Sequence, residues 1–368
     1  MKNGLPLFSL ISGLLAGSLH AGEASIGALK TVSGAMGARA AVRELVAGGR
    51  ENLLPVLHGF QGATPLGSNW LRSAFETIAA AEVRAGRSLP ADELTAFIRD
   101  TANAPAARRL AYEWLLKQDD TLSQRLIPGL LQDPHPDFRR DAVARLISLA
   151  ADADGERAVE LYREALLGAV HEDQVKTVAK VLNAAGDSVD LQRHFGFLAN
   201  WQIVGPFDNR DKKGFAIQYP PELGVDPEAS YDGQLLSDEV HWQAISTEDD
   251  FGVIDIGGQI ENYKGSLMYA TTTFASPVSR DVELRLGTPN AWKLWLNGEL
   301  IFEREEYHRG TRMDQYRIRV SLRSGENTIV LKICQNEQEQ DWAQAYQYQL
   351  RVSDSTGAAV LPAGESSE

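Results

Sequence analysis

The chain has 368 residues, which is too long for one ordinary hydrophobic core and long enough for two domains. Its hydrophobic content of 43% predicts folded, globular structure. The formal net charge of −14 argues against a general binder of nucleic acid or of anionic membranes, because both need a basic surface.

Residues 1–21 are predicted to be an export signal. Lys2 supplies a positive start, and an apolar stretch broken by Ser and Gly runs from Leu5 to Leu19. This stretch is too short and too rich in glycine for a comfortable membrane span, so no transmembrane span is expected in the mature chain. A buried N-terminal helix and a retained anchor are the alternatives. The expected location is therefore outside the cytoplasm of a bacterium: periplasmic, on the cell surface or extracellular.

From residue 25 to residue 198 the apolar residues recur with helical spacing. The segment "DAVARLISLA" places its apolar side chains three and four residues apart, on one face of a helix. A weak internal repeat has the form apolar, basic, two variable residues and Ala, with looser copies at residues 38–42 and 71–75. Its basic positions lie 33, 36, 31 and 37 residues apart, which is typical of one helical hairpin per repeat. These positions are Arg39, Arg72, Arg108, Arg139 and Lys176.

The segment "LIPGLLQDPHPDFRRDAVARLISLA", residues 126–150, resembles a HEAT repeat. Asp133-Pro134 would make the turn between two helices, Pro136 suits the first turn of the second helix, and Asp133 would cap that helix or meet Arg139. The resemblance implies an α-solenoid whose surface could bind a protein partner. An irregular helical bundle is the alternative.

The pattern changes at "WQIVGPFDN", residues 201–209, where the apolar residues begin to alternate. Regularly spaced turn signals separate the segments that follow, which is typical of an antiparallel β-sandwich. Asn297-Gly298 favours a tight type I′ turn. The lone cysteine, Cys334, lies in an apolar strand and is expected to be a buried thiol. The predicted strands span residues 241–245, 252–256, 267–274, 281–286, 292–296, 299–303, 316–322, 328–334 and 346–352.

Residues 291–335, "AWKLWLNGELIF" and "YRIRVSLRSGENTIVLKICQ", resemble the galactose-binding-like jelly roll that accompanies glycoside hydrolases as a carbohydrate-binding module. The resemblance covers residues 199–353 and implies a sandwich with a carbohydrate ligand. Related modules often carry acidic residues before the "W-L-N-G" strand. Here the segment is "GTPNAW", with no acid, which weakens the expectation of an inherited calcium or polar-ligand site at that position. Residues 354–368 are predicted to be a disordered tail.

Candidate ligand-binding residues lie on one strand and in two loops. Alternation places Trp292, Leu294 and Leu296 on the core face and Trp295 on the other. There Trp295 either stacks on a sugar or is covered, by the segment from Trp201 to Tyr219 or by the last helices of the first half. The loops 303–312 and 335–342 leave their strands and are expected to meet at one end of the sandwich, where amides, carboxylates and aromatic rings suit a neutral sugar. Solvated loop charge, with Trp342 plugging the end of the sandwich, is the alternative. The candidates are Trp295, Glu305, Tyr307, His308, Arg309, Asn336, Gln340, Asp341 and Trp342.

No catalytic, cofactor or metal site is predicted. The sequence has no G-x-S-x-G, no HExxH and no phosphate-binding glycine loop, and its histidines are too scattered for metal ligation. A glycosidase would need two facing carboxylates, and the charged loops alone do not specify such a pair. The leading hypothesis is therefore an exported, non-catalytic protein in which a helical scaffold carries a glycan-binding sandwich. The alternatives are a protein assembly scaffold without a glycan ligand and, less favoured, a hydrolase.

Overall fold

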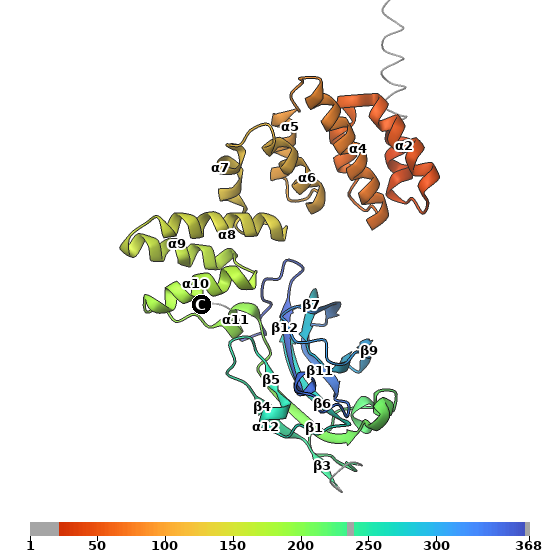
Figure 1. Cartoon of the computed structure of the whole chain (residues 1–368), viewed down its shortest axis with the longest axis vertical. Coiled ribbons are helices and arrows are strands. Elements are labelled where there is room, and N and C mark those ends of the chain that lie inside the picture. Colours follow the sequence, from red (N-terminus) through yellow and green to blue (C-terminus); the bar gives the residue numbers. More distant parts are fainter. Residues whose placement is uncertain (1–21, 234–238, 365–368) are drawn as a thin grey trace, which may run out of the picture. The chain divides into compact units, whose positions relative to one another are not determined.

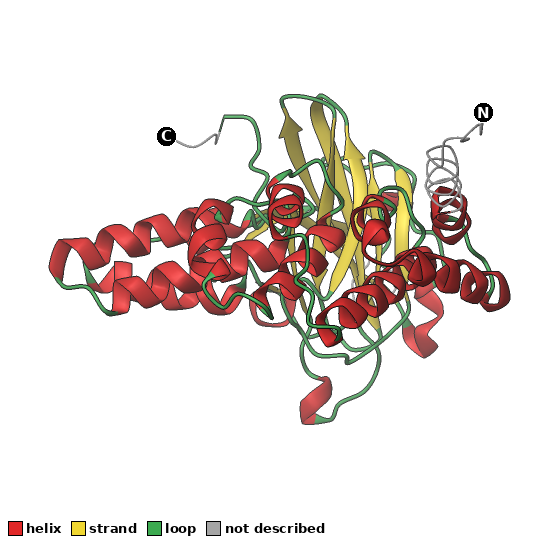
Figure 2. Ribbon diagram, turned by 90° about the horizontal axis from the view of Figure 1, so that it is seen from above, coloured by secondary structure: helices red, strands yellow, loops and turns green. Residues whose placement is uncertain are grey.

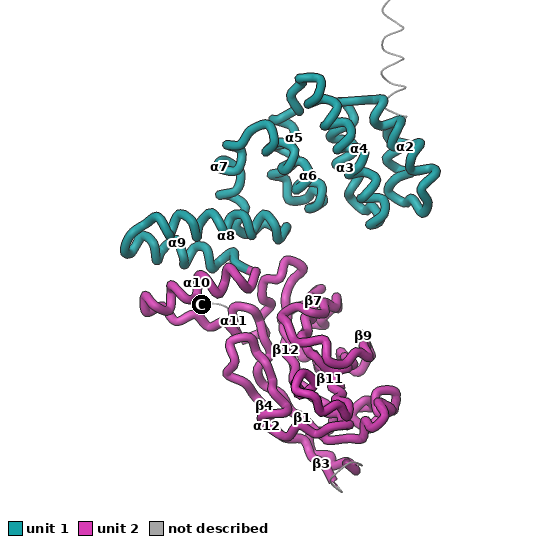
Figure 3. The backbone as a smooth tube through the Cα atoms, in the orientation of Figure 1, with its two compact units in different colours: residues 1–169 teal, residues 170–368 magenta. Residues whose placement is uncertain are grey.

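The computed structural model describes residues 22–233 and 239–364, so the predicted export signal lies outside the described residues. The chain forms two compact units, residues 1–169 and 170–368 (Figure 3). As predicted, the first half is helical and the second half is rich in antiparallel sheet. All of the described strands, yellow in Figure 2, lie after Ala199.

Helices make up the first unit (Figure 1). Residues 22–30 are helical, and α5 with α6 and α8 with α9 pack as neighbouring pairs. Thr64 caps α4 by accepting a hydrogen bond from Gly67 N at 3.0 Å. The further elements are α2 (Ala35–Gly48), η1 (Gly49–Asn52), α3 (Leu53–His58), α4 (Pro65–Arg84), α5 (Ala91–Arg99), α6 (Pro105–Leu116), α7 (Leu122–Leu126), η2 (Ile127–Leu130), α8 (Pro136–Ala151) and α9 (Gly155–Gly168).

A buried ion pair lies in the core of this unit. The guanidinium of Arg108 donates to both carboxylate oxygens of Asp133, at 2.9 and 2.6 Å, and its Nε donates to the carbonyl of Ile98. The two side chains are 0% and 1% exposed. Asp133 was expected to cap the following helix, and this is wrong because its carboxylate is taken by Arg108, while His135 caps α8. Arg139 meets Asp133 through the backbone, donating to the Asp133 carbonyl at 2.8 Å, and it also donates to the carbonyl of Gln132. Pro136 begins α8 as predicted.

The second unit opens with two helices and continues as sheet. A six-stranded sheet has the order β4-β1-β6-β11-β8-β9, and a four-stranded sheet has the order β10-β7-β12-β5. The elements are α10 (Glu172–Ala184), α11 (Leu191–Phe195), β1 (Asn200–Asp208), η3 (Arg210–Phe215), η4 (Pro220–Glu222), β2 (Ser230–Tyr231), β3 (Val240–His241), β4 (Gln243–Ser246), β5 (Ile254–Asp255), α12 (Ile256–Gln259), β6 (Ser266–Ser276), β7 (Arg280–Gly287), β8 (Ala291–Leu296), β9 (Glu299–Arg304), β10 (Tyr316–Leu322), β11 (Gly325–Cys334), η5 (Asp341–Ala343) and β12 (Gln347–Ser353).

Strand alternation divides the apolar side chains of the six-stranded sheet between two cores. Trp292, Leu294 and Leu296 join a core shared with the four-stranded sheet, as predicted. Trp295 belongs to a second core on the opposite face, which it shares with side chains of residues 207–231 and 240–242. Asn297 and Gly298 both have positive φ, 54° and 83°, as a type I′ turn requires.

Two predicted boundaries differ from the structure. The compact second unit begins at Val170 and not at residue 199, because it includes α10 and α11. The predicted disorder from residue 354 is wrong for residues 354–364: Ser353 bridges to Ala359, and Val360, 5% exposed, joins the shared core. The buried side chain of Val360 and several backbone hydrogen bonds therefore hold this segment.

Candidate functional site

The two predicted loops meet at one end of the six-stranded sheet. β8 has β9 and β11 as neighbours, and Ala291 at the start of β8 pairs with Cys334 at the end of β11. The loops after β9 and β11 therefore leave the sheet at the same end of the strands. His308 makes the link, because its Nε2 lies 2.8 Å from Asn336 Oδ1. Its imidazole ring also meets the indole of Trp342 edge to face, with ring centroids 5.2 Å apart.

The indole of Trp342 is open to solvent. Trp342 is 63% exposed, so the expectation that it plugs the end of the sheet is wrong. Asn336, in contrast, is 2% exposed and anchors its loop: its Oδ1 accepts from Gln338 N, and its Nδ2 donates to Gln338 Oε1 at 2.8 Å. The exposed indole of Trp342 and the buried, hydrogen-bonded side chain of Asn336 thus both contact His308.

A groove of about 530 Å³ lies beside these residues. It is lined by Lys212, Asn336, Glu337, Gln338, Glu339 and Gln340. Amides, carboxylates and one ammonium group therefore face this space, which is a mixture that can exchange hydrogen bonds with hydroxyl groups.

Tyr307 forms the inner wall of the loop pair. Its hydroxyl accepts a hydrogen bond from Asn209 Nδ2 at 3.2 Å, and the Lys212 ammonium lies 5.2 Å from its ring centroid. Burial raises the pKa of Tyr307. Asn209 and Lys212 were not predicted as site residues, because the segment "DNRDKKG" has the composition of an ordinary loop. The unusual feature of this loop is the left-handed backbone of Asp211 and Lys212, with φ of 58° and 60°.

The remaining loop candidates lie on the surface. Glu305, Arg309, Gln340 and Asp341 are exposed, and Arg309 contacts Glu306 at 3.4 Å. Of these four residues, Gln340 lines the groove. Among the described residues, no group of three His, Cys, Asp or Glu side chains could hold a metal ion.

Trp295 does not belong to this site. It is 6% exposed, and Phe207, Phe215 and Tyr219 share its core, which agrees with the interpretation that the segment before Tyr219 covers it. Its register partner on β11 is Val330, four residues before Cys334. At about 3.3 Å per residue it lies about 13 Å from the loop end of the sheet. Face alternation predicted its side correctly, but not its distance from the loops.

A buried lysine holds the covering segment in place. Lys332, 0% exposed, donates from Nζ to the carbonyls of Phe215 and Ile217, at 3.1 and 2.7 Å, and to Glu222 Oε1 at 2.8 Å. Tyr269 donates its hydroxyl to the same carboxylate oxygen. Burial lowers the pKa of Lys332. All three ammonium hydrogens of Lys332 have acceptors within the protein, which gives this cluster a structural role.

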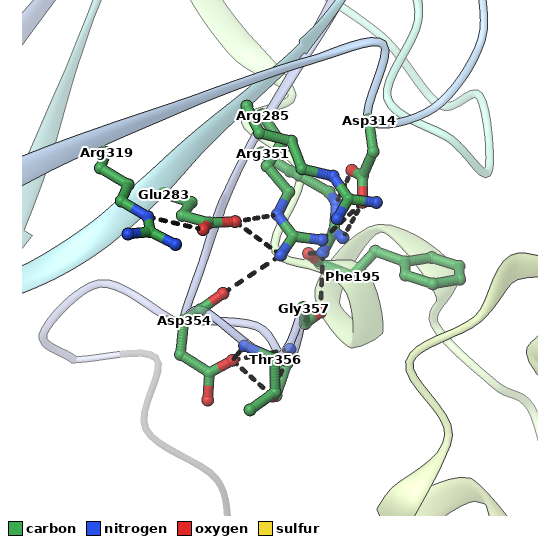
Figure 4. A network of polar contacts seen from close by, with 11 residues as sticks. Phe195, Glu283, Arg285, Asp314, Arg319, Arg351, Asp354, Thr356 and Gly357 are labelled. Atoms are coloured by element: carbon green, nitrogen blue, oxygen red, sulfur yellow. Dashed lines mark hydrogen bonds and ion pairs between the residues drawn. The ribbon is translucent and has the colours of Figure 1, made fainter. Parts of the chain in front are cut away.

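A second polar network covers the outer face of the four-stranded sheet (Figure 4). Arg285 and Arg351 both bind the Asp314 carboxylate, at distances of 2.6 to 2.8 Å. Burial opposes ionisation of Asp314, but Arg351 and Arg285 outweigh it and lower the Asp314 pKa. A groove of about 740 Å³ adjoins the network, yet Glu283 there is already paired with Arg285 and Arg319. The loop end, with its exposed indole, is thus the better candidate for a ligand.

The comparisons with known proteins do not assign a family. No protein-family profile and no curated protein match the chain. Solved structures with partial similarity include a β-glucosidase from Kluyveromyces marxianus, with 10% identity, TM-score 0.26, and coverage of 42% of this chain and 16% of that one. A β-glucuronidase from Faecalibacterium prausnitzii has 15% identity, TM-score 0.24, and coverage of 38% and 20%.

A GH26-CBM35 β-(1,4)-mannanase from Podospora anserina has 16% identity, TM-score 0.16, and coverage of 28% and 25%. The chain spans less than a third of the length of each of these three proteins. At these TM-scores the similarity carries no argument about fold or function. None of the described helices combines the length and hydropathy that crossing a bilayer requires. The chain is therefore similar to parts of several glycosidase structures, and its function has to be argued from its own residues.

Proposed function

We propose that the chain is an exported, non-catalytic glycan-binding protein, in which HEAT-like helical hairpins carry a galactose-binding-like β-sandwich. The glycan would lie across the loops 303–312 and 335–342. The single observation that carries the proposal is the exposed indole of Trp342, which contacts His308 edge to face, while His308 bonds Asn336 in the lining of a polar groove. Exposed large aromatic side chains that are held in one orientation are typical of binding surfaces.

The chemistry of the groove favours an uncharged sugar. The C–H face of a pyranose is apolar and would stack on the Trp342 ring. Its hydroxyl groups would exchange hydrogen bonds with the side chains of Gln338 and Gln340. Loop 335–342 contains three carboxylates, Glu337, Glu339 and Asp341, against one ammonium in the groove lining, Lys212, so the net negative charge would repel a polyanionic glycan.

The test compares Trp342→Ala with wild type by affinity electrophoresis and calorimetry on neutral and uronic-acid polysaccharides, using the full chain. The matched control is Val278→Ala, which truncates another exposed apolar side chain, 55% exposed, outside the loop pair. We expect the wild type and the control to bind a neutral polysaccharide equally. Trp342→Ala should bind at least about tenfold more weakly, which corresponds to about 1.4 kcal/mol.

Two results would contradict the proposal. One is the absence of wild-type binding to every polysaccharide tested, and the other is equal affinity of Trp342→Ala and Val278→Ala. Release of reducing sugar during the binding assay would favour the hydrolase alternative.

The helical unit also presents apolar side chains to solvent. Leu167 is 71% exposed and Met36 is 90% exposed. These side chains support a protein partner on the helical array as a second candidate function. Cross-linking of the full chain, compared with Leu167→Lys, would test whether this surface recruits a partner. Identical cross-linked products for the two chains would argue against it.

A further inference from the structure

His308 adopts a backbone conformation that non-glycine residues rarely adopt. Its φ is 59°, in the left-handed region, where the Cβ atom crowds the following carbonyl. Such a conformation persists only where the surroundings hold it, and strained residues of this kind are concentrated at functional sites. Here the His308 amide donates to the carbonyl of Pro289, which fixes the backbone of the loop against the start of β8.

The hydrogen bonds also define the state of the imidazole. The backbone amide of Gln338 donates to Asn336 Oδ1 at 3.1 Å, so this atom is the oxygen of the Asn336 side chain. His308 Nε2, which lies 2.8 Å from the same atom, must therefore carry a proton and donate it. Since Asn336 is 2% exposed, the bond joins the imidazole to a buried anchor.

The same ring contacts the exposed indole of Trp342. The interplanar angle is 87° at a centroid distance of 5.2 Å, a favourable edge-to-face arrangement. Within the part of the chain that the structure describes, no second aromatic ring lies against Trp342. The orientation of the indole thus depends on His308, and that of His308 depends on Asn336 and on its own strained backbone.

We infer that His308 is the positioning residue of the loop site: it links the two loops and holds the Trp342 indole in the orientation that a sugar ring would stack on. This inference rests on the proposed function and adds the residue that organises the site. His308 need not touch the glycan itself. Its strained backbone places the imidazole between the buried amide and the exposed ring.

The test uses His308→Gly, because glycine removes the imidazole and also relieves the left-handed strain. The matched control is Asn297→Gly. Asn297 also has positive φ, 54°, and also bonds a neighbouring strand through its side chain, to Asn327 and Thr328, at the opposite end of β8. Both substitutions thus replace a residue with positive φ and a hydrogen-bonded side chain by glycine, and only His308→Gly alters the loop site.

We expect His308→Gly to keep a Tm within about 3 °C of wild type, because relief of strain offsets the lost hydrogen bond. Its affinity for the neutral polysaccharide that the wild type binds should fall at least about tenfold, while Asn297→Gly should keep the wild-type affinity. A purely structural role would instead lower the Tm of His308→Gly together with its affinity. Equal affinities of the two glycine variants would overturn the inference.

A measurement without ligand separates this inference from the proposed function. The near-ultraviolet circular dichroism of Trp342 is obtained by subtracting the spectrum of Trp342→Phe from that of wild type. The same subtraction is made in the His308→Gly background. We expect the Trp342 band to fall by at least half when His308 is absent, because the indole then rotates freely. An unchanged band would refute positioning by His308, whereas failure of the wild type to bind any polysaccharide would refute only the proposed function.

Discussion

Replacing Lys332 by methionine should destabilise the second unit strongly. The side chain is 0% exposed, and its ammonium makes three hydrogen bonds, one of them to the carboxylate of Glu222, which is itself 8% exposed. Methionine preserves most of the volume but leaves that carboxylate and two carbonyls of the covering segment without their donor. Breaking a buried ion pair from one side costs about 3–5 kcal/mol. Because Tyr269 still donates to Glu222, we expect about 3 kcal/mol, or a fall in Tm of about 6–12 °C.

The assay is scanning calorimetry of the full chain together with hydrogen exchange of amides 210–222. Lys293→Met is the matched control. Lys293 lies on β8 two residues before Trp295, so both side chains are on the same face of the sheet. Lys293 pairs at 2.9 Å with Glu303; the lysine side chain is 12% exposed and that of Glu303 is 50% exposed, and the ammonium lies 4.7 Å from the ring centroid of Phe215. Because Glu303 stays half accessible to water after the substitution, we expect Lys293→Met to cost about 1 kcal/mol. If Lys332→Met and Lys293→Met lower the Tm equally, the reasoning about burial is refuted; faster exchange of amides 210–222 only in Lys332→Met would support it.

Three other changes test further parts of the fold. Arg108→Met leaves the buried carboxylate of Asp133 without its partner. It should lower the unfolding free energy of the helical unit by about 3–5 kcal/mol, measured by urea titration followed at 222 nm. A loss below about 1 kcal/mol would contradict the buried pair. Burial raises the pKa of Cys334 to about 12, so between pH 9 and 12 the unfolded chain releases a proton that the folded chain keeps. Stability should therefore fall with rising pH by about 1.4 kcal/mol per pH unit more in wild type than in Cys334→Ala, and parallel curves of Tm against pH would argue against this. Val360→Ala should cost about 1–3 kcal/mol, measured by calorimetry, because the side chain fills the shared core; an unchanged Tm would mean that the segment is not held.

The period of the apolar residues predicted the two halves of the chain because it reflects local geometry. Spacing of three and four residues describes one face of a helix, and alternation describes one face of a strand. The same local rules predicted Pro136 at the start of α8 and the positive φ of Asn297. These features depend on residues that lie next to one another in the chain.

Pairings over long distances in the chain could not be predicted in the same way. Asp133 has nearby cations in the sequence, yet its partner is Arg108, 25 residues away. Lys332 and Glu222 are 110 residues apart and meet only because an irregular segment folds over the outer face of the sheet. Neither pairing leaves a periodic signal in the sequence.

The candidate site was predictable where strand ends define it. β9 and β11 both flank β8 and run in the same direction, so the loops that follow them leave the sheet at the same end, which is why His308 and Asn336 lie in the same region. Trp295 was grouped with them because alternation gives the face of a residue and not its position along the strand. Lys212 was missed because its approach depends on an unusual backbone conformation.

The short helix α11 belongs to the β fold that follows it. Arg351 donates to the carbonyl of Phe195 at 3.0 Å, Val352 N donates to the carbonyl of Gly196, and Leu198 N donates to the carbonyl of Leu350. A fragment that began where the apolar period changes would lack the residues that bond to β12. The backbone groups of β12 would then be exposed, and the Arg351 guanidinium would lose its contact with the ring of Phe195. If this module has been exchanged between genes, the inherited segment must include its preceding helix, and recombinant expression of the sheet should likewise start at or before residue 190.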